Sequence, residues 1–146
     1  MFYILNHNLV LPFMKKPTDL VTQVTKAIET NYADAQDFYK RGIERFELQD
    51  YRGSISDLTK ALEIDPTNKW CYLYNGIAKM AIVDYHGAIA DMNQAIALGP
   101  MFTAAYYSRG LLKMELGQTA GGIFDLNKAG ELSNSEIHEG FSFNNN

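Results

Sequence analysis

The chain has 146 residues, a length that fits one domain or one short repeat array. Hydrophobic residues make up 47% of it and charged residues 21%, a balance too apolar for a disordered chain and too mixed for a fibrous one. Thirteen basic and seventeen acidic residues give a net charge of −4, and no basic run exceeds two residues, which argues against a nucleic-acid partner.

The amino-terminal residues 1–17 are predicted to be an irregular segment, because Pro12 and Pro17 interrupt it. Their apolar beginning has no preceding positive charge and is broken by Asn6, so a secretory signal is not expected. Met14 is an alternative start, and residues 1–13 need not belong to the native mature chain.

A helix is predicted over 18–30, with Thr18 as its N-cap. Its pattern recurs 34 residues later, where Val24 aligns with Leu58 and Ala27 with Ala61. Residues 18–34 are therefore interpreted as the second half of a repeat, a lone helix that shields the flank of the first full copy.

From residue 35 onward the 34-residue period is explicit, because five columns are identical in three copies. These columns are Gly42, Gly76, Gly110; Gly53, Gly87, Gly121; Ile55, Ile89, Ile123; Asp57, Asp91, Asp125; and Ala61, Ala95, Ala129. The register divides residues 35–136 into three copies, 35–68, 69–102 and 103–136.

Within each copy the apolar spacing is helical rather than alternating, which predicts a helix pair. With 18–30 this gives seven helices, the other six near 35–48, 51–64, 69–82, 85–98, 103–116 and 119–132. Pro66 and Pro100 end the first two copies, whereas Asn134 stands in that column of the third. The remaining residues 137–146 are predicted to be a disordered tail of low complexity, which leaves the last helix pair poorly capped.

With these columns the sequence resembles the tetratricopeptide repeat family, in particular its bacterial branch. The resemblance rests on the aromatic column Phe38, Tyr72, Tyr106, the glycine column that begins at Gly42, and the small residues Ser54, Ala88 and Gly122. It implies an all-α fold, an α-α superhelix or right-handed solenoid of antiparallel helix pairs.

Two columns have a direct physical interpretation. Small residues allow two helices to approach to about 8 Å where they cross. One column of the first helices holds Arg41, Asn75 and Arg109, and the aspartate column lies on the second helices. We therefore expect ion pairs between the two helices of a copy. The alternative is that these charges are independently solvated, since exposed pairs contribute only about 0–1 kcal/mol.

Residues for catalysis or metal binding are not grouped in the sequence. His7, His86 and His138 lie in different segments, and no cysteine or carboxylate accompanies them at ligand spacing. The glycines of 117–122 lack the following Lys-Ser/Thr and the preceding strand of a phosphate loop. We therefore expect no enzyme, no metal and no cofactor, although a fold by itself does not exclude catalysis.

The single cysteine, Cys71, cannot form a disulfide within the chain, which is typical of a reducing compartment. It is read as a small buried hydrophobe. No run of eighteen apolar residues predicts a transmembrane helix. The expected location is the cytoplasm, without membrane association.

The family resemblance places a second apolar stripe of the first helices on the hollow of the superhelix. Its residues are Tyr39, Ile43, Phe46, Trp70, Leu73, Tyr74, Ile77, Met80, Tyr107, Leu111 and Met114. Without an obvious internal partner, this stripe predicts a non-catalytic scaffold that binds an apolar or amphipathic protein segment, with Trp70 and Tyr74 as hot spots. The alternative is a purely structural role, in which the stripe only packs one helix against another.

Two further expectations concern partners. Some family members clamp an acidic peptide tail with lysines, asparagines and an arginine, but the matching positions here are Tyr39, Ile43, Tyr74, Ala104 and Ser108, so such a clamp is not expected. The alternative function is a self-associating structural protein, an end-to-end homodimer through Ile123, Leu126, Ile137 and Phe141 at the poorly capped end.

Overall fold

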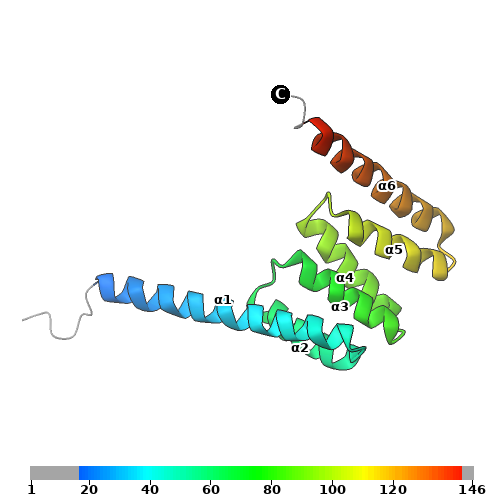
Figure 1. The fold of residues 1–146 in the computed structure, drawn as a ribbon. Coiled ribbons are helices and arrows are strands. Elements are labelled where there is room, and N and C mark those ends of the chain that lie inside the picture. The colour runs from blue at the N-terminus through cyan, green and yellow to red at the C-terminus, as the bar shows by residue number, and fades with distance from the viewer. Residues whose placement is uncertain (1–16, 143–146) are drawn as a thin grey trace, which may run out of the picture.

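The computed structural model describes the backbone of residues 17–142 and the side chains of residues 26, 27, 30, 31 and 34–135. Every element within residues 17–142 is a helix: α1 (Pro17–Glu47), α2 (Tyr51–Ile64), α3 (Lys69–Ala81), α4 (Tyr85–Leu98), α5 (Thr103–Glu115) and α6 (Thr119–Ser142). They form three hairpins, α1–α2, α3–α4 and α5–α6, which stack one after another (Figure 1). The all-α helical repeat solenoid expected from the sequence is confirmed.

The first helix differs from the prediction. Separate helices over 18–30 and 35–48 are wrong, because α1 is one helix of 31 residues. The column that holds Pro66 and Pro100 holds Tyr32 here, so no residue lacks the N–H that continues the helix. The amino-terminal half of α1 extends past the end of α2 (Figure 1). Residues 1–16, expected to be irregular, lie outside the described residues.

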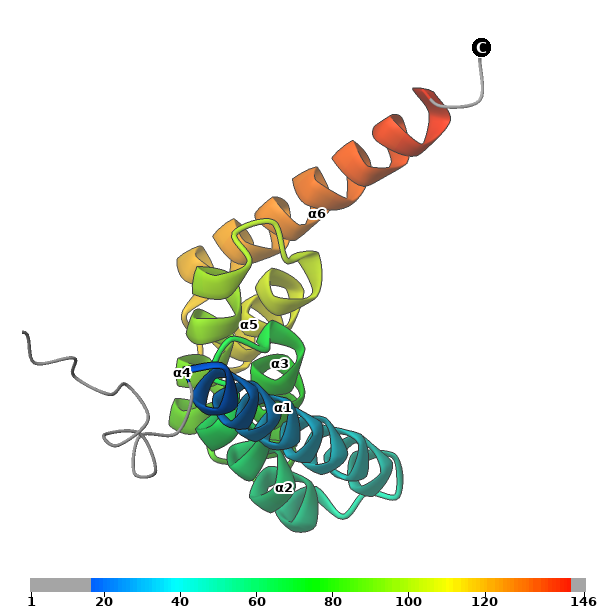
Figure 2. The same ribbon diagram turned by 90° about the vertical axis from the view of Figure 1, so that its left-hand side faces the viewer.

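The last helix differs in the same way. An end at residue 132 and a disordered tail from residue 137 are wrong for the backbone up to Ser142, because α6 runs 24 residues from Thr119. Asn134 stands in the proline column and permits the helix to continue. The end of α6 projects beyond α5 in both views (Figures 1 and 2). Residues 143–146 lie outside the described residues.

The turn inside each hairpin is built by the same two positions. The side chains of Asp50 and Asp84 cap α2 and α4 by accepting hydrogen bonds from the backbone N–H groups of Gly53 and Gly87, each at 3.0 Å. One position earlier the backbone is left-handed, with φ of 62° at Gln49 and 68° at Val83. The third copy places Gly117 there, at φ 72°, which is the residue type that this conformation favours.

The glycine column on the first helices marks where each hairpin is tightest. A Cβ added at Gly42 would lie 2.8 Å from Leu58 Cγ, and one at Gly110 would lie 2.9 Å from Leu126 Cγ. At Gly76 it would meet the backbone oxygen of Ala88 at 3.2 Å. The expected role of the small residues at helix crossings is confirmed.

The core lies partly within hairpins and partly between successive hairpins. Leu58 and Ala61 of α2 pack with Cys71 of α3, and Leu73 of α3 packs with Phe102 and Ala105 at the start of α5. The first helix of each repeat therefore covers the apolar surface left by the hairpin before it. No further hairpin follows α6 within the described residues, so the last surface of this kind has no such cover.

Candidate functional site

A buried aspartate links the two helices of each hairpin. Asp125 is 0% exposed, and its carboxylate accepts hydrogen bonds at 2.7 Å from both Arg109 Nε and Nη2. Lys113 Nζ lies 2.8 Å from the same carboxylate. These cations lower the pKa of Asp125, although burial acts in the opposite direction. The expected ion pair between α5 and α6 is confirmed.

The first copy repeats this arrangement. Arg41 donates two hydrogen bonds of 2.7 Å to Asp57, and Arg45 Nη1 lies 2.8 Å from Asp57 Oδ2. The hydrogen bonds from Arg41 are the main cause that lowers the pKa of Asp57. Because two cations occupy this carboxylate, it serves the architecture rather than acid–base chemistry.

The ion-pair arrangement around the aspartate of the second copy is weaker. Asp91 has a single cation, Lys79, at 2.7 Å, and accepts a 3.0 Å hydrogen bond from the amide of Asn75. Burial outweighs these contacts and raises the pKa of Asp91. The same column of the repeat thus holds aspartates of opposite pKa shift, because asparagine replaces arginine in the middle copy.

Cys71 is fully buried, and its Sγ donates to the carbonyl oxygen of Leu58 at 3.3 Å. Burial raises the pKa of this thiol to about 12. A thiol held neutral at physiological pH is a poor nucleophile and a poor metal ligand. Its interpretation as a packed hydrophobe is confirmed.

In the first copy the predicted binding stripe mostly has partners inside the chain. Tyr39 and Ile43 pack against the cluster formed by Leu58, Ala61 and Cys71. Tyr74 of the second copy packs against the same cluster, and its ring meets that of Phe46 edge-on at 5.6 Å. These side chains join the first repeat to the second.

The second copy overturns the expectation that the stripe lacks an internal partner. Leu73 is only 4% exposed and lies in the core with Ala95 and Phe102, so a ligand has no access to it. Ile77 and Met80 pack against the cluster that includes Leu112 of α5. Leu73, Ile77 and Met80 are therefore packed against the following repeat.

Trp70 differs from its neighbours on α3. Its ring meets Phe102 edge-on at 4.5 Å, yet the residue remains 46% exposed. It therefore stays available for contact with another molecule.

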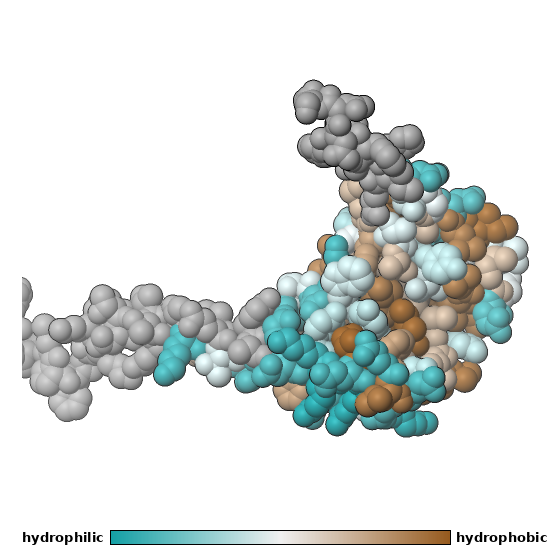
Figure 3. Space-filling view, viewed as in Figure 1, coloured by the Kyte–Doolittle hydropathy of each residue, from teal (hydrophilic) through white to brown (hydrophobic). Residues whose placement is uncertain are grey.

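The third copy leaves the same columns open. Tyr107, Leu111 and Met114, which we call the α5 stripe, are 54%, 44% and 40% exposed. Their counterparts in α3 are covered by α5, but no described helix covers α5 in turn. Figure 3 shows hydrophilic residues over much of α1 and α2, whereas hydrophobic patches lie over the middle of the array as well as near its α5–α6 end.

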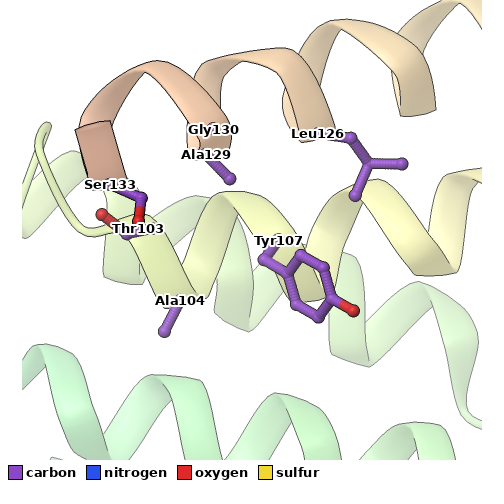
Figure 4. A pocket seen from close by; sticks show the side chains of 7 residues that line it. All are labelled: Thr103, Ala104, Tyr107, Leu126, Ala129, Gly130 and Ser133. Carbon is purple, nitrogen blue, oxygen red and sulfur yellow. The ribbon is translucent and has the colours of Figure 1, made fainter.

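A pocket of about 570 Å³ opens between α5 and α6 (Figure 4). We call it the terminal pocket; its lining residues are Thr103, Ala104, Tyr107, Leu126, Ala129, Gly130 and Ser133. None of them is charged. The predicted site included only Tyr107 of this set. The signal in the sequence that could have located the pocket is Gly130, which stands where the other copies have Leu62 and Ile96.

Two findings limit the chemistry of the described part of the chain. No three His, Cys, Asp or Glu side chains among its described residues are grouped to hold a metal ion. Likewise, none of the helices in that part has the length and apolar character needed to cross a bilayer.

The comparisons with known proteins agree with the repeat. A family model described as tetratricopeptide repeat matches residues 38–68, and a search of curated proteins gives no match. The second TPR of Spaghetti (RPAP3), solved bound to HSP90 peptide SRMEEVD, is 25% identical with a TM-score of 0.69, over 73% of this chain and 98% of that one. The first TPR domain of human RPAP3 is 26% identical with a TM-score of 0.66, over 69% and 80%.

MamA is similar in fold, with a TM-score of 0.70 and 21% identity over 84% of this chain and 71% of that one. The 34-residue columns, the stacked hairpins and these likenesses have one common explanation. Residues 38–68 carry a tetratricopeptide repeat, and the stacked hairpins have the fold of solved tetratricopeptide repeat domains.

Proposed function

We propose that this chain is a non-catalytic protein-interaction scaffold that binds an apolar or amphipathic partner segment of about ten to fifteen residues. The observation that carries the proposal is the α5 stripe, three large apolar side chains on successive turns of one helix that remain 40–54% exposed. Trp70 on α3 adds a further exposed aromatic ring, in contact with Phe102 before α5. Exposed apolar residues that form a continuous stripe are typical of interaction sites.

The composition of this surface indicates the partner's chemistry. Tyr107, Leu111 and Met114 carry no charge, and an aromatic ring beside a flexible methionine adapts to varied apolar side chains. The nearby cations Arg109 and Lys113 are both engaged by Asp125. Binding should therefore depend on burial of apolar surface and vary little with salt.

The solved relatives support peptide binding as the class of function. Both TPR domains of Spaghetti (RPAP3) with an HSP90 peptide are 25–26% identical to this chain. This chain places Tyr39, Ile43, Tyr74, Ala104 and Ser108 at the positions where the acidic-tail clamp would need cations and amides. We therefore propose a peptide ligand that is apolar rather than an acidic tail.

The experiment uses a display library of random twelve-residue segments, selected on the full chain. Peptides rich in aromatic and aliphatic residues are the expected outcome. Binding of a selected peptide, measured by fluorescence polarisation, should weaken about tenfold or more in the double variant Leu111→Ser with Met114→Ser, since two apolar contacts are lost.

The matched control is Leu48→Ser with Val83→Ser, which removes two apolar side chains from the hairpin turns that are even more exposed than Leu111 and Met114. This variant should bind like the unchanged chain. Circular dichroism must show the same helix content in both variants. Selection of acidic peptides whose binding collapses in high salt would refute the proposal, and so would equal binding by both double variants.

The remaining parts of the proposal rest on composition. The net charge of −4 supports a protein rather than a nucleic-acid partner. The lone, unpaired cysteine supports a reducing compartment, for which the cytoplasm is our proposal.

A further inference from the structure

We propose that the terminal pocket is occupied, in a two-fold symmetric dimer, by the carboxy-terminal end of α6 from a second copy of this chain. This inference shares Tyr107 with the peptide-binding proposal, but it is tested separately through Gly130 and the end of α6, which are not part of the α5 stripe.

The two preceding repeats show what kind of group fills this position. By the 34-residue register, Tyr107, Leu126 and Ala129 of the pocket correspond to Leu73, Met92 and Ala95. Leu73 and Ala95 of that earlier set pack with Phe102 and Ala105 at the start of α5, which are 6% and 0% exposed, and Met92 packs with Leu112 further along α5. One repeat before, Leu58 and Ala61 are covered by Cys71 of α3. The fitting occupant is therefore a helix that carries a large apolar residue and a small one a turn apart.

Within residues 17–142 the chain places no further helix there. The period would begin a fourth first helix at residue 137, but α6 continues without a break to Ser142. Its final turns lead away from α5 rather than folding back over it (Figures 1 and 2). Among the described residues no helix lies over the terminal pocket while α6 keeps this path, so a second copy is a source for one.

Gly130 makes room for such a helix. A Cβ added at this residue would meet nothing within 4 Å, so no contact inside the chain requires glycine. Glycine inside a helix is unfavourable, and the other copies place Leu62 and Ile96 in this column. The missing side chain deepens the pocket at the point where an incoming residue would enter, between Ala129 and Ser133 (Figure 4).

The end of α6 has the matching pattern. Leu126, Gly130 and Ser133 follow one another at helical spacing along the pocket, and the same spacing continues to Ile137 and Phe141, with Gly140 between them. Two α6 helices paired antiparallel about an axis beside Ser133 would set position 137 opposite position 130, and position 141 opposite position 126.

The lengths agree with this pairing. From Leu126 to Ser133 a helix rises about 10 Å, and from Ser133 to Phe141 about 12 Å. A two-fold axis repeats the contact, so each copy supplies one helix end and one pocket. Ile137 and Gly140 place a large apolar residue and a small one a turn apart, as Phe102 and Ala105 are placed at the start of α5.

The test is the mass of the full chain in solution, measured by sedimentation from low to high micromolar concentration. The expected result is a reversible dimer. Gly130→Leu fills the pocket with the residue type of the first copy and should weaken the dimer about tenfold or more. Its helix content and thermal midpoint should be equal to or above those of the unchanged chain, since leucine favours the helix.

Ala120→Leu is the matched control, because it adds the same side chain to an exposed position in the first turn of α6. This variant should dimerise normally. Phe141→Asp should abolish the dimer by altering the inserted end and leaving the pocket intact.

A mixture of Gly130→Leu and Phe141→Asp chains provides the decisive measurement. The Gly130→Leu chain supplies an unchanged α6 end, and the Phe141→Asp chain supplies an unchanged pocket. The mixed dimer should therefore be more stable than either variant's own dimer. A wild-type chain that stays monomeric at high micromolar concentration would overturn the proposal. A dimer that survives Gly130→Leu, or a mixture without complementation, would overturn it as well.

Discussion

The buried carboxylate of Asp125 offers a quantitative test of the ion pairs inside the helix hairpins. Asp125→Asn keeps the shape of the side chain and removes its negative charge. The side chains of Arg109 and Lys113 are only 15% and 20% exposed, so both positive charges would lose a buried counter-ion. Removal of one partner from a buried pair costs about 3–5 kcal/mol. Because the amide oxygen still accepts one hydrogen bond, we expect about 3 kcal/mol.

The other two copies supply internal controls with smaller expected losses. In Asp57→Asn the released Arg41 side chain is already 52% exposed and can be hydrated, so the loss should be about 1–2 kcal/mol. In Asp91→Asn one lysine is released and the hydrogen bond with Asn75 can persist. Since burial already disfavours the charged form of Asp91, its loss should be below about 1 kcal/mol.

The assay is urea unfolding at pH 7, followed by circular dichroism, with the transition midpoint compared at an unchanged slope. A loss of 3 kcal/mol is a large part of the roughly 5–15 kcal/mol that stabilises a domain, so Asp125→Asn should be plainly separated from Asp91→Asn. Equal losses in the three variants, or the largest loss at Asp91, would refute the assignment of the cations.

The acid side of the stability curve checks the same assignment. The folded pKa values of Asp57 and Asp125 lie below the ordinary value of 3.8, so their contribution is present above that pH and is lost as the pH falls further. For Asp91 the sign is opposite, because its folded pKa is raised and its contribution is lost as the pH rises. Asp125→Asn should flatten the acid-induced loss of stability, whereas Asp91→Asn should not.

Three further predictions concern single positions. Val83→Gly should stabilise the chain by about 0.5–1 kcal/mol, because a β-branched residue at φ 68° is strained and its side chain is 66% exposed. Gly117→Val should destabilise the chain by about 1–2 kcal/mol for the same reason. Both effects are measured as shifts of the thermal midpoint. Ser54→Ala should stabilise by about 1 kcal/mol in the same assay, since the hydroxyl is buried without a hydrogen-bond partner and the second copy has Ala88 there. Cys71 should resist a thiol-reactive reagent at pH 8 until urea unfolds the chain, because the thiol is buried and its pKa is about 12; rapid stoichiometric labelling of the folded chain would contradict its placement.

The helix pairs were predictable because their signals are local. The 34-residue register, the prolines at 66 and 100 and the capping residues Asp50 and Asp84 give three hairpins with ends within a few residues of those observed. The two errors have one cause: Tyr32 and Asn134 occupy the proline column at either end of the array. A periodic pattern suggests a break by analogy with the other copies, but the backbone breaks only where a residue prevents its continuation.

The candidate binding surface was only partly predictable. The sequence identified the apolar columns correctly, yet Leu73 and Tyr107 occupy the same column and are 4% and 54% exposed. Periodicity states that two residues share a helix face; it does not state whether another helix lies against that face.

The sequence by itself thus determined the repeat, the helix hairpins and the pairs of Arg41 with Asp57 and Arg109 with Asp125, since each depends on residue type and spacing within one copy. Only the tertiary structure decided which apolar residues remain exposed, because burial depends on the neighbour that each hairpin meets. The α5 stripe and the terminal pocket exist because α6 runs straight on and no described helix covers the last hairpin, a relation between elements that no single copy of the repeat contains.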